Sequence, residues 1–176
     1  MPLPRGSPSP GPVNWNIRPF AETDRAALLR LNGDNWPSVY PLDEDLLAWL
    51  RGFGGHHRVA VDPAGVVLGY LMTFSSASAY DDTEIRELRR RVAEPFLYIC
   101  QVAIAPEHRR RRIGCAFYEA ATDAAQRQGL RLLCCDVNTD PPNPESFAFH
   151  RRLGFLEIGQ GIASNGVAIA YLTRKL

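Results

Sequence analysis

The chain has 176 residues, 45% of them hydrophobic, which suits one domain with a single core. Its formal net charge at pH 7 is +1, so no strong overall field favours nucleic acid or an anionic membrane. No apolar run approaches the ~20 residues that a membrane-spanning helix needs. We therefore expect neither a membrane nor a nucleic-acid partner.

The first fourteen residues contain five prolines and no apolar stretch, which is typical of a disordered tail rather than a secretory signal. We expect a disordered tail over residues 1–14 and one folded domain over residues 15–176. Four cysteines lie in strand-like or helix-like runs, namely Cys100, Cys115, Cys134 and Cys135. Without a Cys-x-x-Cys pair or clustered histidines, we expect free thiols, no metal site and a cytoplasmic location.

Hydrophobic spacing and turn residues predict alternating short elements in the first half of the chain. In order, we expect a strand, two helices, a hairpin of two strands and a third helix, at Asn16–Phe20, Thr23–Asn32, Asp43–Arg51, His57–Asp62, Val66–Phe74 and Asp82–Ala93. The segment Gly33–Pro41 is expected to be a loop rich in turn residues and aromatics, and Ser75–Asp82 a polar loop.

The second half predicts a long central strand, a helix, a strand, a helix and a closing hairpin. These are expected at Phe96–Ala105, Ile113–Gln128, Leu130–Asn138, Asn143–Leu153, Phe155–Ala163 and Val167–Leu176. Thr139–Pro142 is expected to be a stiff loop, and Asn165-Gly166 is a strong hairpin-turn signal. The pattern predicts an α/β fold: a mixed, twisted central sheet flanked by helices on both faces.

The segment Gln101–Ala116 carries the most specific signal in the chain. A strand-like run ends at Ala105, four arginines follow at Arg109–Arg112, and a helix begins directly afterwards. Backbone N–H groups and the positive end of the helix dipole then converge on one place, which favours a phosphate group. Because Gly114 has no side chain, we expect an anionic ligand to approach its backbone closely.

The alternative for these arginines is solvated surface. Arginine provides nearly all of the positive charge of this chain, and a second cluster, Arg89–Arg91, has the spacing of a solvated helix face. The position of Arg109–Arg112 between a strand and a glycine-containing helix start is what favours a ligand.

The pattern Arg111-x-x-Gly114-x-Ala116 resembles the (Gln/Arg)-x-x-Gly-x-(Gly/Ala) signature of the GNAT superfamily of acyl-CoA-dependent N-acetyltransferases. A second segment, Asn143–Phe155, resembles the family's Asn-x-x-Ala-x-x-Leu-Tyr-x-x-x-Gly-Phe stretch. The resemblance implies the GNAT fold, with acetyl-CoA as cofactor. It also implies direct acetyl transfer to a primary amine of a small molecule or peptide, without a covalent enzyme intermediate.

The resemblance also assigns residues to the cofactor: strand backbone to the pantetheine arm, the arginine loop and helix start to the pyrophosphate, and an asparagine to a hydrogen bond. These residues are Val102, Ala103, Ile104, Arg109, Arg110, Arg111, Arg112, Ile113, Gly114, Cys115, Ala116 and Asn143. For Asn143, a helix-capping role is the alternative, and both roles can hold together.

Two departures from the family pattern concern proton transfer. His150 stands where the family commonly has the tyrosine thought to protonate the departing thiolate, so His150 is a candidate general acid. A neutral helix-surface histidine is the alternative. Gln101 stands near the place where many relatives have a carboxylate, and it cannot titrate. Asp136, acting through water, is the candidate general base, with Asp81 and Asp82 as further candidates and a capping role as the alternative for Asp136.

The acceptor amine is expected opposite the cofactor, between the loop around Trp36–Tyr40 and the loop Ser75–Asp82. Trp36 and Tyr40 could form an apolar or cation–π wall for the amine, and Asp81 could attract its charge. Ordinary loop packing and solvated surface are the alternatives for these three residues.

Three function classes follow. The first is an active N-acetyltransferase. The second is a coenzyme A-binding sensor or regulatory module without turnover, which His150 and Gln101 keep open. The third, a protein associated with nucleic acid, is disfavoured by the neutral overall charge. The amine is not identified by the sequence, and a homodimer is left open.

Overall fold

A computed structural model describes residues 14–176. The tail expected over residues 1–14 lies outside the described residues apart from its last position. Seven strands are present: β1 Asn16–Pro19, β2 Arg58–Val61, β3 Val67–Ser75, β4 Phe96–Ile104, β5 Leu132–Asp140, β6 Leu156–Ile162 and β7 Ala168–Lys175. The α-helices are α1 Arg25–Asp34, α2 Glu44–Gly52, α3 Thr83–Arg91, α4 Ile113–Arg127 and α5 Pro144–Arg152, with short 3-10 helices at Glu22–Asp24 and Pro106–His108.

The strands form one mixed sheet in the order β1-β2-β3-β4-β5-β7-β6. Strands β4 and β5 pair in parallel, and every other neighbouring pair is antiparallel. The parallel pair is connected through α4, as a parallel connection requires a crossover.

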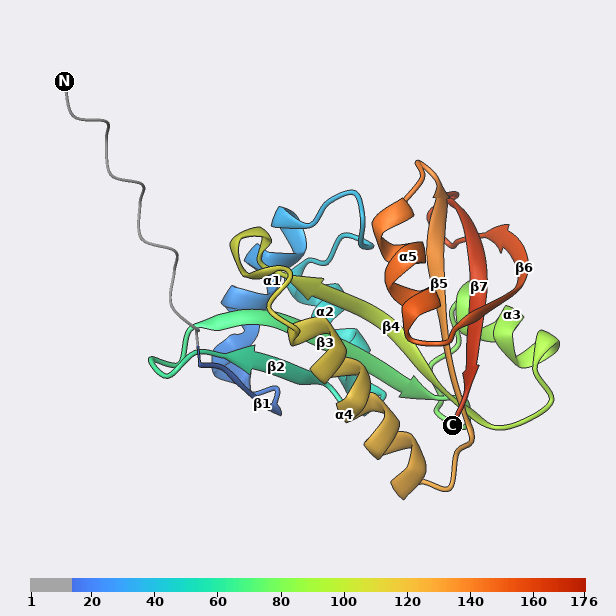
Figure 1. The fold of residues 1–176 in the computed structure, drawn as a ribbon, viewed down its shortest axis with the longest axis horizontal. Helices are drawn as coiled ribbons and strands as arrows, with labels where there is room; N and C mark the ends of the chain where they lie inside the picture. The colour runs from blue at the N-terminus through green and yellow to red at the C-terminus, as the bar shows by residue number, and fades with distance from the viewer. Residues whose placement is uncertain (1–13) are drawn as a thin grey trace.

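Helices cover both faces of the sheet (Figure 1). Helices α1, α2 and α3 pack on one face in a cluster that includes Leu28, Leu47 and Leu88. On the other face, α4 contributes Phe117 to a second cluster, and α5 contributes the partly buried Phe149. The expected fold class is confirmed: a mixed, twisted sheet between two helical layers.

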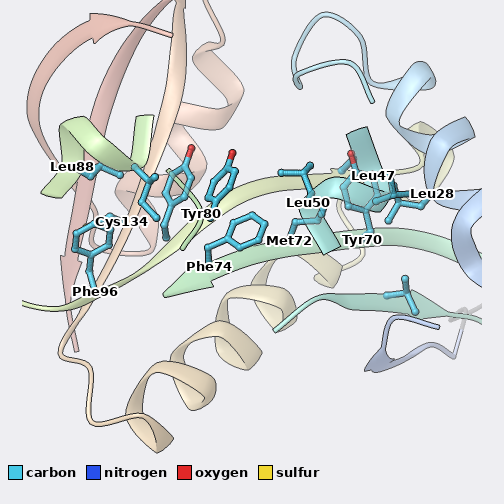
Figure 2. Packing of buried hydrophobic residues seen from close by; sticks show 14 of the residues in the cluster. Leu28, Leu47, Leu50, Tyr70, Met72, Phe74, Tyr80, Leu88, Phe96 and Cys134 are labelled. Atoms are coloured by element: carbon cyan, nitrogen blue, oxygen red, sulfur yellow. The ribbon is translucent and has the colours of Figure 1, made fainter. Parts of the chain in front are cut away.

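Aromatic side chains extend the first cluster toward the middle of the sheet. Figure 2 shows Phe74 of β3 beside Tyr80, which comes from the loop before α3, and their rings stack with centroids 4.1 Å apart. The hydroxyl of Tyr80 therefore sits at the border between this core and the centre of the sheet.

The sheet opens at its centre. Strands β4 and β5 pair from Phe96 to Ile99 and separate beyond that point, which is visible in Figure 1 as a widening gap. At the same place β4 contains a bulge: Met72 of β3 pairs with Gln101 and the next residue pairs with Ile99, which leaves Cys100 without a partner across the β3–β4 ladder. Bulges bend the strand that contains them.

The element boundaries match the expected ones with one notable difference. The segment after Asn138 was expected to be a loop, but β5 continues to Asp140, which pairs with Ala168 of β7 after a register shift. The ladder with β7 explains the extension, since an antiparallel partner stabilises extended backbone that local turn residues would otherwise interrupt.

Replacing Phe117 by Ala tests the layer between α4 and the sheet. The side chain is 0% exposed, so its removal leaves a cavity and should lower the free energy of unfolding by about 3–5 kcal/mol. Glu119→Ala, at an exposed position of the same helix, is the matched control and should change stability little. Urea unfolding of both variants measures the difference, and equal stabilities would contradict the packing described here.

Candidate active site

A cavity of about 230 Å³ lies where β4 and β5 separate. Its wall is formed by these two strands, by α2, the start of α3, α4 and α5, by the loops before α2 and α3, and by the β6–β7 turn. Polar and aromatic residues of the wall include Tyr40, Trp49, Tyr80, Asp82, Glu84, Tyr98, Gln101, Tyr118, Asp136, Asn143, Ser146, His150 and Ser164.

The loop that leads into α4 has an unusual backbone. Arg110 and Arg112 have φ angles of 61° and 65°, in the left-handed region that non-glycine residues seldom adopt. Arg112 is the N-cap of α4 and makes no side-chain capping bond. Among hydrogen bonds within residues 14–176, none uses the backbone N–H groups of residues 110–115. An uncapped helix start with free N–H groups is a suitable site for an anion.

Arg111 strengthens this site. Its Nη1 atom is buried and has no hydrogen-bond partner among the described residues. A buried cationic nitrogen without a partner is costly, so an anion placed beside it would be stabilised. Arg109 is already engaged, since its Nη2 donates to Asn35 Oδ1 at 2.8 Å and ties the loop to the end of α1.

Three of the expected cofactor residues also have structural roles. A Cβ atom built on Gly114 would lie 3.2 Å from Phe149 Cζ, so the absence of a side chain allows α4 and α5 to approach each other. The side chain of Ile113 is 1% exposed and belongs to the core. Ala116 donates its N–H to the Arg112 carbonyl at 3.1 Å, so this N–H is not free for a ligand.

The central strand offers an unpaired edge to the cavity. Val102, Ala103 and Ile104 pair with β3 on one side, while on the other side the pairing with β5 has ended at Ile99. Val102 also lines the cavity. Backbone groups along this edge are available to a ligand that lies between the strands, as another strand would use them.

Asn143 is a helix cap that also lines the cavity. Its Oδ1 accepts the N–H of Ser146 at 3.1 Å, at the start of α5, so the structural role is present. Its side-chain NH₂ group makes no hydrogen bond within the described part of the chain and remains available to a ligand.

Asp136 lies on β5 opposite the bulge of β4. Its Oδ1 accepts the hydroxyl of Tyr98 at 2.6 Å. Burial, with the nearby carboxylates Glu84 and Asp82, raises the pKa of Asp136 to about 7, against a lowering effect from Tyr98. A carboxyl group that titrates near neutral pH on the wall of a cavity can exchange a proton with a bound molecule.

His150 is buried within α5, at 6% exposure, rather than lying on the helix surface. Its Nδ1 lies 2.7 Å from the Ser146 carbonyl, which can only accept, so Nδ1 carries the proton. Burial lowers the pKa of the ring, which is therefore neutral at pH 7. The other nitrogen, Nε2, lies 2.5 Å from the Tyr118 hydroxyl and accepts a hydrogen bond from it.

Sequence reasoning missed Tyr118, which lines the same cavity. One signal was present: Tyr118 follows Gly114 by four residues, so both lie on the face of α4 that meets α5. The T-shaped contact of Tyr118 with Phe149, at 5.3 Å between centroids, shows that this face is in contact with α5.

In the sequence, Gln101 stands out only as a residue that cannot titrate. In the structure, it holds the loop around Trp36–Tyr40 in place. Its Oε1 accepts from the Tyr70 hydroxyl at 2.8 Å and from Asn32 Nδ2 at 3.2 Å, and its Nε2 donates to the Tyr40 carbonyl at 3.0 Å. With both its amide oxygen and its amide nitrogen hydrogen-bonded, Gln101 anchors the segment before α2 to β4.

The residues expected to bind the acceptor are not all at the cavity. Tyr40 lines it, whereas Trp36 is 60% exposed and is not part of its wall. Asp81 is also outside the wall and pairs with Arg89 at 2.8 Å. Its neighbour Asp82 turns inward because it caps α3, accepting the N–H of Ile85 at 2.9 Å.

Comparison with known proteins identifies the family. A family model described as the acetyltransferase (GNAT) family matches residues 22–155. The chain belongs to the GNAT acetyltransferase family. No curated protein matches the sequence.

Several solved structures share the fold of this GNAT protein. Ard1 from Thermoplasma volcanium is 20% identical with a TM-score of 0.73, covering 92% of this chain and 97% of its own. The ribosomal-protein-S18-alanine N-acetyltransferase from Escherichia coli is 17% identical with a TM-score of 0.69, covering 92% and 94%. A phosphinothricin acetyltransferase from Sinorhizobium meliloti, in complex with AcCoA, is 21% identical with a TM-score of 0.68, covering 92% and 88%. At these identities the likeness establishes the fold alone.

The remaining chemistry of this GNAT domain is limited. All four cysteines are free, and burial raises the pKa of the Cys134 thiol to about 12. Within residues 14–176, no group of three or more His, Cys, Asp or Glu residues could hold a metal ion. The described helices include none that is long and apolar enough to cross a bilayer.

Replacing Asp136 by Asn tests the buried carboxylate through stability. Because the pKa of Asp136 is higher in the folded protein than in the unfolded chain, protonation of its carboxyl group stabilises the folded state. This stabilisation is complete below about pH 4 and is lost as the pH rises to about 7. The substituted amide would still accept from Tyr98 but would not ionise. At pH 8 the variant should therefore be about 2–4 kcal/mol more stable than the wild type, with the difference shrinking toward pH 4. Urea unfolding at both pH values measures this, and a constant difference would contradict the raised pKa.

Proposed function

We propose that this protein is an acetyl-CoA-dependent N-acetyltransferase that transfers an acetyl group directly to a primary amine. One observation carries the proposal: a cavity lies where β4 and β5 separate, and its wall contains a carboxyl group, that of Asp136, whose pKa is raised to about 7. The family and the fold support the same class of reaction.

The residues present fit acetyl-CoA. The buried Nη1 of Arg111 and the free N–H groups at the start of α4 would hold the pyrophosphate, and the unpaired edge of β4 would hold the pantetheine arm. The side-chain NH₂ of Asn143 would donate to the same arm. When bound, acetyl-CoA supplies an acetyl thioester, whose C–S bond breaks as the C–N bond to the amine forms.

Asp136 is assigned as the proton acceptor. An amine attacks only after it has lost a proton, and Asp136 is the cavity carboxyl group whose pKa, about 7, lets it accept that proton at physiological pH. The hydroxyl of Tyr98, 2.6 Å away, holds the carboxylate in position.

Tyr118 is assigned as the proton donor to the departing sulfur, in place of His150. Neutral His150 has its one ring proton on Nδ1, bound to the Ser146 carbonyl, so it has none to give at Nε2. The hydroxyl of Tyr118 faces Nε2 and would turn from it to give its proton to the sulfur. It would then recover, through water, the second proton that the amine nitrogen loses as the amide forms. His150 becomes a positioning residue that orients this hydroxyl.

Thermal unfolding with and without saturating acetyl-CoA, followed by an assay of free-thiol release over a panel of amines, tests the function. Ligand at a hundred times its Kd should stabilise the fold by about 2.7 kcal/mol, or about 5–10 °C in Tm. Arg111→Met should abolish most of this shift without lowering the Tm of the free protein, because it removes an unpaired buried cation. Arg152→Met, at an exposed position of α5, is the control and should retain the shift.

The outcomes separate the function classes. No shift with acetyl-CoA would reject the proposal, and a shift without thiol release from any amine would favour the coenzyme A-binding sensor or regulatory module. The cytoplasmic location and the homodimer remain predictions.

Two substitutions distinguish the proton donors. Tyr118→Phe keeps the ring packing and removes the hydroxyl, so kcat should fall by about 10²-fold or more while the KM for acetyl-CoA changes little. In His150→Gln, the side-chain oxygen can still accept from Tyr118 but cannot titrate, so most of kcat and the pH profile should be retained. Loss of kcat in His150→Gln together with an active Tyr118→Phe would assign the proton to His150 instead.

A further inference from the structure

The charges on the cavity wall all have one sign. Among the residues that the structure describes, the wall includes the carboxylate residues Asp82, Glu84 and Asp136 and no arginine or lysine, although the chain contains 20 basic residues. The acidic end of the cavity is formed by Asp82 and Glu84 near the start of α3, with Ser164 of the β6–β7 turn beside them. A molecule that enters this end meets negative charge that no wall residue neutralises.

Glu84 has an unused oxygen at this end. The residue is 6% exposed, and its Oε1 accepts both the N–H and the hydroxyl of Ser164, at 2.9 and 3.0 Å. Its Oε2 is buried and has no hydrogen-bond partner among the described residues. A buried carboxylate with one oxygen unsatisfied is costly alone and favours a cation as its partner.

The nearest arginines do not supply that cation. Arg89 of α3 is engaged by Asp81 at 2.8 Å and by the carbonyl oxygens of Ser76, Ser78 and Tyr80. Arg91 of α3 donates to the Gln160 carbonyl at 3.0 Å and lies over the ring of Tyr171. Neither side chain is part of the cavity wall.

The acidic end adjoins the place where β4 bulges. Asp82 accepts the hydroxyl of Tyr80, and that hydroxyl lies 3.9 Å from the Sγ atom of Cys100 at the bulge. The wall between the acidic end and the loop before α2 is apolar, with Leu46, Trp49 and Leu50 of α2. The cavity thus combines an apolar surface for methylene groups with carboxylates at one end.

We propose that the acceptor is an aliphatic primary amine that carries a second positive charge and no carboxylate or phosphate group. The inference rests on the proposed function and names the substrate class of the same site. The reacting nitrogen lies beside Asp136 and loses its proton there, while the second cation is held by Glu84 Oε2 and Asp82. An amino acid is rejected because its carboxylate would face this end with no cation to receive it. A free diamine and a basic peptide both offer a primary amine together with a second positive charge.

Three amines of matched length test the charge. They are 1,5-diaminopentane, pentylamine and 5-aminopentanoate, whose far ends are positive, neutral and negative. With saturating acetyl-CoA, kcat/KM from free-thiol release should be about tenfold or more higher for the diamine than for pentylamine, and lower still for the amino acid. Capped Lys-Arg and Lys-Glu dipeptides form a second pair, which distinguishes a free diamine from a basic peptide as the source.

Two variants assign the preference to the acidic end. Glu84→Gln keeps an oxygen for Ser164 and removes the charge, so it should reduce the preference for the diamine over pentylamine, measured as the ratio of their kcat/KM values, by about tenfold. Asp81→Asn changes the neighbouring carboxylate outside the cavity wall and should leave the preference unchanged. The wild-type series decides the question even where Glu84→Gln fails to fold.

A binding measurement separates this inference from the proposed function. In thermal unfolding with saturating coenzyme A, the diamine should raise Tm further and 5-aminopentanoate should not. Equal or better use of pentylamine or the amino acid would overturn the substrate class while leaving an acetyltransferase. A shift with acetyl-CoA but neither turnover nor stabilisation with the diamine would overturn it as well. No shift with acetyl-CoA would reject the proposed function itself.

Discussion

The site depends on the separation of β4 from β5 after Ile99. Two hydrogen-bonded strands would leave no room for a ligand, so the sheet must open to form the cavity. The opening is tolerated because each strand keeps its outer antiparallel partner: β4 stays paired with β3 as far as Ile104, and β5 with β7 as far as Asp140. The bulge at Cys100 bends β4 at the same point. Two backbone edges are thereby left open to a molecule that can bind between them.

The loop before α4 accumulates costs that a bound anion would offset. Arg110 and Arg112 adopt left-handed φ angles, each at a cost of about 1–2 kcal/mol for a non-glycine residue. Arg111 buries a guanidinium nitrogen without a partner, and the helix begins without a side-chain cap. Each feature is unfavourable in the free protein, and Arg111 and the helix start leave N–H donors without a partner among the described residues. Strain and unsatisfied polar groups of this kind are typical of ligand-binding segments.

The fold could be predicted because it follows from local patterns. Apolar periodicity and turn residues located the strands and helices, and the strand–arginine–glycine order indicated the loop whose N–H groups make no hydrogen bond among the described residues. Contacts between distant segments could not be predicted in this way. The spacing of Gly114 and Tyr118 puts them on one helix face, but it does not show that the Tyr118 hydroxyl meets His150 or that Gly114 lies against Phe149. The choice between two adjacent loop carboxylates was likewise open, since it depends on which one caps α3.

On the proposed function, the cofactor loop Arg109–Arg112 is positive and the amine end with Asp82 and Glu84 is negative. This difference in charge affects the proton transfer. The arginine loop attracts an anionic cofactor and repels a cationic amine, while Asp82 and Glu84 do the reverse, so each substrate is directed to its own end. Asp136 lines the same cavity as Asp82 and Glu84, and its pKa is raised by burial and by those carboxylates. A cation that binds at the acidic end neutralises part of this repulsion and lowers the pKa of Asp136. Binding of the amine therefore favours the ionised carboxylate that must accept its proton, so the base is formed when its substrate is present.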